Sequence, residues 1–257
     1  LARMGATVLV TARDPGRGRD TAEEIRRDTG REVAVLPADL ASQASVRELA
    51  AEVRRRTDRL HVLLNNAGAI YTTRQLSPDG HELTLALNHL GYFLLTNLLL
   101  DLLRSGAPSR VVNVASAAHR RGRIDWDDLQ GERRYGGGWK AYSQSKLANI
   151  LFTRELARRL QGSGVTANCL HPGVVATGFG HNNPTLFGTL VKLAAPLFIS
   201  PARGADTAVW LATAPEVAGV SGEYFARRRP IPSTRAGQDP EAARRLWEVS
   251  ERLTGLA

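Results

Sequence analysis

The sequence contains almost no cysteine and shows no pattern of metal ligands. Cys169 is the only cysteine among 257 residues, which excludes an internal disulfide framework and is typical of a reducing compartment. The six histidines have no spacing typical of metal ligands, and a lone cysteine leaves a zinc site without thiolate partners. We therefore expect a cytoplasmic protein without a metal site.

Long hydrophobic runs are also lacking. A membrane-spanning helix needs about 18 consecutive apolar residues, and the longest candidate, residues 186–199, is interrupted by Lys192 and Pro196. The sequence does not open with the charged and apolar segments of a secretory signal peptide. We therefore expect no membrane span.

Lysine is scarce although the chain is strongly basic. Lys and Arg together number 34 against 25 acidic residues, which gives a net charge of +9. Such a charge raises nucleic acid as a partner. The arginines are interspersed with acidic residues, however, as at 54–58 and 241–245, and no nucleic-acid-binding signature accompanies them. We interpret them as solvated helix faces and expect no nucleic-acid partner, with a basic interaction protein as the alternative.

Strand and helix patterns alternate along the whole chain. Apolar, β-branched segments predict strands, and amphipathic segments between them predict helices. Continuously apolar strands that alternate with helices indicate a parallel sheet covered on both faces. The sequence therefore predicts one α/β domain over 1–257, a Rossmann-like doubly wound parallel sheet. The predicted strands lie at 6–11, 32–37, 60–65, 110–115, 165–170 and 223–226, and the predicted helices at 17–29, 45–57, 80–104, 139–161, 201–213 and 239–253.

Tyr142 and Lys146 stand four positions apart on one of these helices. Residues i and i+4 share a helical face, and a nearby ammonium lowers the pKa of a phenol from its usual value of about 10. The spacing therefore predicts that Tyr142 is an acid/base group near neutral pH. In a chain with only three lysines, a lysine here indicates that a compact ammonium is required. Taken alone, the pair also fits a Tyr and a Lys on a solvated helix.

Unusual polar residues and turns follow several predicted strands. In a doubly wound sheet, ligands bind outside the carboxyl ends of the strands. Ser116 lacks the Gly-x-Ser-x-Gly context of a hydrolase nucleophile, and by itself it would fit a helix cap. Together these residues indicate a ligand site at one edge of the sheet: Arg13, Asp39, Asn65 to Gly68, Ser116 and Pro172-Gly173.

The ordered set of motifs resembles the short-chain dehydrogenase/reductase family over essentially the whole chain. The segments 88–93, 112–116, 221–225 and 246–255 are similar to its retinol dehydrogenase-like and WW-domain oxidoreductase-like members. The resemblance implies hydride transfer between NAD(P) and an alcohol or carbonyl compound. The residues that match are Asn65-Asn66-Ala67-Gly68, Asn88, Ser116, Tyr142-x-x-x-Lys146, Pro172-Gly173 and Thr177.

The same resemblance implies four catalytic residues. Tyr142 would protonate the carbonyl oxygen in reduction or accept the alcohol proton in oxidation, and Ser116 would hydrogen-bond the same oxygen. Lys146 would lower the tyrosine pKa and bind the nicotinamide ribose. Asn88 would anchor a water that links Lys146 to the bulk proton supply.

Arg13 bears on the choice of cofactor. NAD-selective relatives commonly carry an acid at the end of the second strand, whereas an arginine suits the 2′-phosphate of NADP. We expect NADP, with NAD as the alternative because Asp14 is adjacent, and we expect Asp39 to face the adenine edge. By resemblance, the remaining cofactor-binding residues are Asn66, Ala67, Gly68, Tyr142, Lys146, Pro172, Gly173 and Thr177.

The substrate implied by the resemblance is a lipophilic alcohol or carbonyl compound, such as a retinoid, a steroid or a long-chain compound. The apolar segment 174–200 fits a lid over the site, and equally an ordinary helix that covers the core. The loop 120–138 is expected to border the site. Homo-oligomers that form through the helices near 80–104 and 139–161 are a further expectation by analogy.

One family motif does not occur in the sequence. The glycine-rich phosphate turn Thr-Gly-x-x-x-Gly-x-Gly is absent, and residues 1–6 are similar to the end of the helix that follows it. We therefore expect a truncated sheet without its first strand, and a gap between the strands at 6–11 and 60–65. A catalytically silent remnant that binds no dinucleotide is the alternative function. Extended-branch epimerases share Tyr-x-x-x-Lys, but Asn65–Gly68 argues against them.

Overall fold

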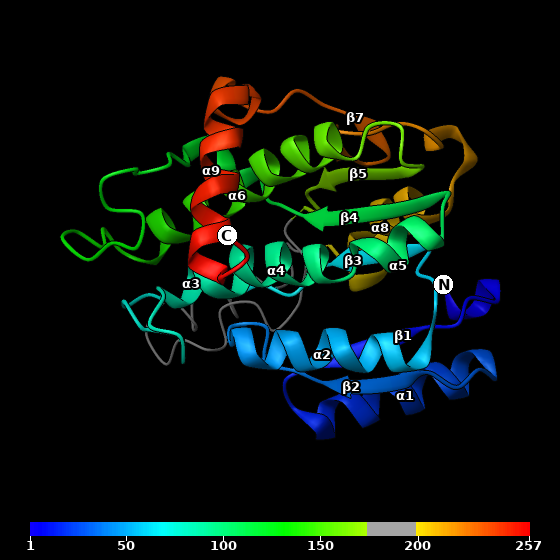
Figure 1. Cartoon of the computed structure of the whole chain (residues 1–257). Helices are drawn as coiled ribbons and strands as arrows, with labels where there is room; N and C mark the ends of the chain where they lie inside the picture. The colour runs from blue at the N-terminus through cyan, green and yellow to red at the C-terminus, as the bar shows by residue number, and fades with distance from the viewer. Residues whose placement is uncertain (174–198) are drawn as a thin grey trace.

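Parallel strands with helices packed around them form the core of this chain (Figure 1). The structure is a computed structural model, and it describes residues 1–173 and 199–257. The strands form two sheets, one in the order β1-β2 and one in the order β3-β4-β5-β6-β7. Every pair is parallel except β6 with β7. The predicted Rossmann-like α/β class is confirmed, whereas a single domain over 1–257 stays a prediction.

The strands are short, and the helices lie between them in the sequence. The strands are β1 (Leu9–Ala12), β2 (Ala34–Pro37), β3 (Val62–Asn65), β4 (Ser109–Val114), β5 (Val165–Leu170), β6 (Tyr224–Ala226) and β7 (Arg229–Pro230). The α-helices are α1 (Pro15–Thr29), α2 (Gln43–Arg56), α3 (Leu83–Leu85), α4 (Gly91–Leu98), α5 (Leu100–Ser105), α6 (Gly138–Arg159), α8 (Pro201–Thr213) and α9 (Pro240–Thr254). Short helical turns are η1 (Ala2–Met4), η2 (Ala86–Leu90), η3 (Ala117–Arg121), η5 (Pro215–Val217) and η6 (Arg235–Gln238).

The helix predicted at 80–104 is divided into several pieces. It contains α3, the π-helix η2, then α4 and α5. A Cβ at Gly91 would lie 2.4 Å from the backbone oxygen of Leu40, so a residue without a side chain lets this helix lie against the chain after β2. The antiparallel strand β7 was not predicted, because two exposed residues carry no alternating pattern.

β1 and β3 are not hydrogen-bonded to each other in the part of the chain that the structure describes. The predicted gap between them is therefore confirmed. The two sheets are joined instead by an apolar cluster that includes Leu36 of β2, Val46 and Leu49 of α2, and Leu94 of α4. Packing of α2 on α4 thus holds the small sheet beside the large one.

Helix α6 is buried over most of its length. It lies between the large sheet and α9 (Figure 1). Its Phe152 packs against Phe93 of α4 and Trp247 of α9, with ring centroids 5.5 Å and 5.9 Å away. This aromatic cluster fixes the helix that carries Tyr142 and Lys146.

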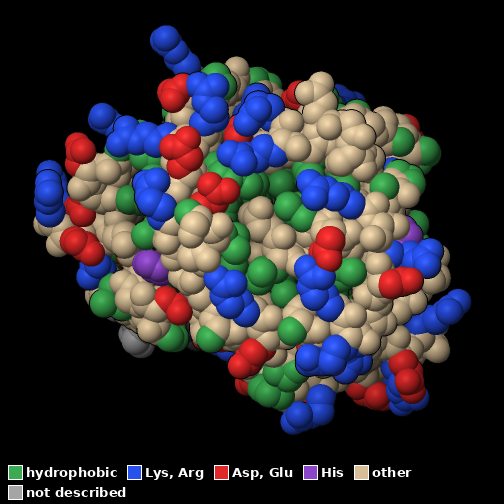
Figure 2. All heavy atoms as spheres, viewed as in Figure 1, with side chains coloured by type: hydrophobic (Ala, Val, Ile, Leu, Met, Phe, Trp, Pro, Cys, Tyr) green, Lys and Arg blue, Asp and Glu red, His purple; other side chains and the backbone are tan. Residues whose placement is uncertain are grey.

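Charged side chains of both signs share the surface. Figure 2 shows Lys and Arg side chains spread over one face with Asp and Glu between them. Several form ion pairs along one helix, such as Arg26 with Glu23 at 2.7 Å. In the described ranges, none of the helices combines the length and the apolar character that crossing a membrane requires.

Candidate active site

The first turns of α6 place Tyr142 and Lys146 on one buried face. Gly137 adopts a positive φ of 85°, and a Cβ at Gly138 would lie 2.4 Å from the backbone oxygen of Tyr71. Glycine is therefore needed for the helix to begin so close to the loop after β3. Tyr142 is 8% exposed and Lys146 is 3% exposed. The Lys146 ammonium lies 5.7 Å from the centre of the Tyr142 ring.

Ser116 meets Tyr142 from the neighbouring strand. It lies two residues after the end of β4 and caps η3, where its hydroxyl oxygen accepts a hydrogen bond from Ala118 N at 3.2 Å. Its side chain is also hydrogen-bonded to the Tyr142 phenol, which lowers the phenol pKa. Burial has the larger effect and raises the pKa of Tyr142 above its ordinary value. The predicted lowering was therefore wrong in direction, because spacing along a helix does not report desolvation.

Lys146 is held by the backbone of β4. Its Nζ donates to the carbonyl oxygen of Val114 at 2.9 Å, and Asn149 Nδ2 donates to the same oxygen at 3.3 Å. Tyr92 faces the ammonium from α4, with its ring centre 5.8 Å away. Burial lowers the pKa of Lys146 to about 7. The lysine can therefore change its charge near neutral pH.

Asn88 lies in the π-helix η2 and connects three parts of the site. Its Nδ2 donates to the carbonyl oxygen of Ala69 and to Ser145 Oγ, both at 2.9 Å, and its Oδ1 accepts from Ala69 N at 2.9 Å. Ser145 in turn donates to the carbonyl oxygen of Tyr142 at 2.8 Å. π-Helical turns occur frequently at functional sites. Asn88 thus ties the turn after β3 to helix α6.

The turn Asn65-Asn66-Ala67-Gly68 passes directly over these groups. A Cβ at Gly68 would lie 3.2 Å from both Asn88 Oδ1 and Lys146 Nζ, so the missing side chain lets the backbone approach the lysine. Tyr92 donates to the carbonyl oxygen of Ala67 at 2.7 Å. Buried Asn65 Nδ2 donates to Asn113 Oδ1 at 2.8 Å and bridges β3 to β4.

Arg13 and Asp39 follow β1 and β2, at the carboxyl ends of the small sheet. Arg13 is exposed. The neighbouring Asp14 caps α1 and accepts from Gly16 N and Arg17 N at 2.7 and 3.2 Å. Asp39 Oδ1 accepts from Ala41 N at 3.0 Å. Arg13 and Asp39 therefore both lie at the end of the small sheet. Tyr142, Lys146 and Ser116 lie instead on elements next to the large sheet.

The remaining predicted cofactor residues follow β5. Pro172 is half-buried and Gly173 is exposed. Gly173 has a φ of 89°, and a Cβ there would lie 3.0 Å from Ile199. Thr177 and residues 174–198 of the apolar segment 174–200 lie outside the described residues, so the lid stays a prediction.

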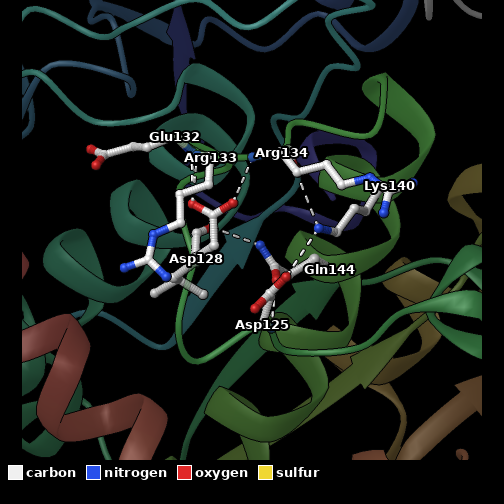
Figure 3. A network of polar contacts seen from close by, with 8 residues as sticks. Asp125, Asp128, Glu132, Arg133, Arg134, Lys140 and Gln144 are labelled. Carbon is white, nitrogen blue, oxygen red and sulfur yellow. Dashed lines mark hydrogen bonds and ion pairs between the residues drawn. The ribbon is translucent and has the colours of Figure 1, made fainter.

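The loop between η3 and α6 is tied to α6 (Figure 3). Gln144 Oε1 accepts from Asp125 N at 2.9 Å, and its Nε2 donates to the carbonyl oxygen of Leu129 at 2.8 Å. Lys140 pairs with Asp125 at 3.0 Å. Asp128 accepts backbone hydrogen bonds from residues 132–134, which lower the pKa of its carboxyl group. The loop thus has a fixed position beside the start of α6.

The geometry defines a site in which a phenol, a hydroxyl and an ammonium meet at the carboxyl ends of β3 and β4. The family profile for short chain dehydrogenases matches residues 1–185. The chain belongs to the short-chain dehydrogenase family, and it is an oxidoreductase that acts on CH–OH groups. The NAD(P) cofactor is shared by this family.

Among curated proteins, the chain is similar to human retinol dehydrogenase 14, with 44% identity over all of this chain and 81% of that relative. It is also 44% identical to human retinol dehydrogenase 13, over all of this chain and 79% of that relative. A crystal structure of an uncharacterized protein from Mycobacterium paratuberculosis has a TM-score of 0.77 and 36% identity, over 99% of this chain and 86% of that chain. The predicted retinol dehydrogenase-like group is confirmed.

Several groups that contact the site residues were not predicted from the sequence. The carbonyl oxygen of Val114 belongs to the backbone, and no side-chain pattern could indicate it. Ser145 and Asn149 lie on the same helix as Lys146, at positions −1 and +3 from it, and Tyr92 follows Asn88 by four residues. Their spacing from the motif residues was the available signal. His119, buried beside Ser116, had none.

Proposed function

We propose that this chain interconverts a lipophilic alcohol and its aldehyde or ketone, with NADP(H) preferred as the hydride carrier. The observation that carries the proposal is the hydrogen bond between Ser116 and the Tyr142 phenol, with the Lys146 ammonium 5.7 Å from the phenol ring. A hydroxyl pair of this kind can bind one oxygen of a substrate and pass a proton to it.

Each residue has a defined part in carbonyl reduction. Tyr142 donates its phenol proton to the carbonyl oxygen, while Ser116 hydrogen-bonds the same oxygen and orients it. The phenolate left behind is buried, so the nearby Lys146 ammonium stabilises it. Bound NADPH supplies the hydride. Asn88 keeps the turn at Ala69 in place beside Lys146. In the proposed reaction it also anchors a water that links Lys146 to the bulk proton supply.

The described residues fit both ends of a dinucleotide. The missing side chain of Gly68 lets the turn lie against Lys146 Nζ, and the Lys146 ammonium could donate hydrogen bonds to the ribose hydroxyls there. At the other end, the exposed Arg13 guanidinium suits a 2′-phosphate. A structure from Escherichia coli CFT073, described as a short chain dehydrogenase complexed with NADPH, has 25% identity and a TM-score of 0.69 over 87% of each chain. These observations support NADP over NAD.

The names of the relatives support a lipophilic substrate. The two human proteins above are retinol dehydrogenases, so retinal is the first carbonyl compound to test. Incubation of the chain with NADPH and all-trans-retinal should give retinol, measured by chromatography, and NADH should give a lower rate. Tyr142→Phe should lose about 100-fold or more in turnover, while NADPH binding, followed by its fluorescence, stays near that of the wild type.

Cofactor preference has its own variant. Arg13→Ala should weaken NADPH binding and leave NADH binding unchanged, and Arg17→Ala, another exposed arginine close by on α1, is the matched control. Equal losses in both variants would show that general positive charge, not Arg13, attracts the cofactor. If the wild-type chain binds neither dinucleotide, the catalytically silent remnant is the correct reading.

A further inference from the structure

His119 is fully buried although it lies on a short surface turn. It stands in η3, three residues after Ser116, and its side chain is 0% exposed while Ala117 and Arg120 are exposed. Its Nδ1 lies 2.7 Å from the carbonyl oxygen of Ser116. Because a carbonyl oxygen only accepts, Nδ1 carries the proton and donates it.

The imidazole also packs against Tyr224 of β6, whose hydroxyl lies 3.5 Å from the same Nδ1. The two rings meet edge to face with centroids 5.0 Å apart and an interplanar angle of 78°. Behind the turn, a Cβ at Gly122 would lie 2.4 Å from the carbonyl oxygen of Ser143, so η3 is pressed against the backbone of α6 one residue after Tyr142. The turn that carries His119 therefore has little freedom between β6 and α6.

These contacts converge on Ser116. Its carbonyl oxygen accepts from His119 N at 3.1 Å as well as from His119 Nδ1, and its hydroxyl oxygen accepts from Ala118 N at 3.2 Å. The backbone and side chain of the serine are thus both restrained, which leaves its hydroxyl to meet the Tyr142 phenol. A hydroxyl held in this way loses little rotational freedom when substrate binds.

We propose that His119 is a positioning residue, whose Nδ1–H bond to the Ser116 carbonyl holds the Ser116 hydroxyl in hydrogen-bonding position against Tyr142. The inference rests on the proposed function of Ser116 and Tyr142 and adds a residue to it. His119 touches no reacting atom, so its effect passes entirely through Ser116.

Two substitutions separate the hydrogen bond from the packing. In His119→Phe the ring stays and the donor is lost, whereas in His119→Asn an amide donor returns near the position of Nδ1. Loss of the bond should lower kcat about tenfold in His119→Phe, with little change in the KM for NADPH, and His119→Asn should recover to within about threefold of the wild type. His81→Phe is the matched control. His81 also hydrogen-bonds a backbone carbonyl, but that of Leu253, at 3.0 Å, rather than that of Ser116.

A double-mutant cycle with Ser116→Ala gives the decisive readout. If His119 acts through Ser116, His119→Phe should cause no further loss of kcat in the Ser116→Ala background. The same tenfold loss in both backgrounds would overturn the proposal, and so would equal activities of His119→Phe and His119→Asn at matched thermal stability. Both results would assign His119 a purely structural role.

A second measurement needs neither turnover nor cofactor. In protein with 13C-labelled tyrosine, the Tyr142 phenol can be titrated by NMR and assigned by its disappearance in Tyr142→Phe. Loss of the Ser116 hydrogen bond should raise the phenol pKa in Ser116→Ala. His119→Phe should raise it in the same direction, and His119→Asn should not. An unshifted titration in His119→Phe would overturn the inference, even if the chain proves to be catalytically silent.

Discussion

Lys146 combines deep burial with a charge that the proposed reaction uses. The residue is 3% exposed, and its ammonium donates to one backbone oxygen, that of Val114. Removing an ammonium from water favours its neutral form, and the pKa of Lys146 is lowered to about 7 from an ordinary value of 10.5. At every pH at which Lys146 is charged, the burial of its ammonium lowers the free energy of unfolding.

The stability of the protein should record this cost as a pH dependence. Between about pH 7 and pH 9 the folded chain has released the Lys146 proton and the unfolded chain retains it, so unfolding takes up a proton and the free energy of unfolding rises with pH. Below about pH 7 both states are protonated and the full cost is present. Lys146→Met should therefore exceed the wild type in stability most at about pH 6, with the difference shrinking toward about pH 9 in urea unfolding.

Lys140→Met is the matched control for that series. Lys140 is exposed and pairs with Asp125 at 3.0 Å, so its replacement should shift stability by a small amount that is nearly constant between about pH 7 and pH 9. A Lys146→Met difference that is equally flat would contradict the link between burial and the charge of Lys146.

At the scale of elements, α9 supports helix α6. Trp247 packs edge to face on Phe93 with centroids 4.8 Å apart, and the Arg159 guanidinium lies 4.2 Å from the centre of its ring. Its indole N–H donates to Glu251 at 2.7 Å. One side chain of α9 thus contacts both α4 and α6, the helices that carry Tyr92 and Lys146.

Trp247→Ala should therefore lower stability and activity together. Deleting a buried tryptophan costs about 3–5 kcal/mol, and the loosened α6 should lower turnover because small displacements of catalytic groups are expensive. Trp247→Phe keeps an aromatic ring against Phe93 and should lose much less. Thermal or urea unfolding and turnover of both variants check this; a loss under about 1 kcal/mol in Trp247→Ala would show that α9 does not brace α6.

The same elements show what sequence reasoning could reach. Tyr142, Lys146 and Ser116 were located because a four-residue helical spacing and the end of a strand are local patterns. The strand at 165–170 and the helix at 201–213 were predicted with the bounds that the structure has. The raised pKa of Tyr142 and the interruption of helix 80–104 depend on burial and on contact with Leu40, and no local pattern encodes either.

At the scale of the whole molecule, the two described sheets differ in how many strands they contain and in how deeply their residues are buried. β4 is hydrogen-bonded to β3 on one side and β5 on the other, and five of its six residues are buried. Within residues 1–173 and 199–257, β1 is paired with β2 alone, and none of its four residues is buried. The small sheet depends on the α2–α4 packing for its connection to the rest.

Hydrogen exchange should therefore divide the molecule into two units. Strands with few buried contacts open at lower free energy than the global unfolding, so the amides of β1 and β2 should exchange faster than those of β4 and β5. Mass spectrometry of peptides that cover 9–37 and 109–170 checks this in one experiment. Equal protection of both regions would show that the two sheets unfold as one unit.

The predictions of a cytoplasmic location, of a homo-oligomer and of no nucleic-acid partner stay predictions.

The acceptor that holds Lys146 is a main-chain atom, the oxygen of Val114. Every amino acid at position 114 would present that same oxygen as long as the strand forms. Alanine scanning there would therefore report only on packing, and the anchor of the lysine would go unnoticed in any catalogue of point mutants. The position of Lys146 depends on the direction in which the backbone carbonyl of the strand points. Many sequences can form such a strand, and no exchange of a side chain removes its carbonyl oxygen.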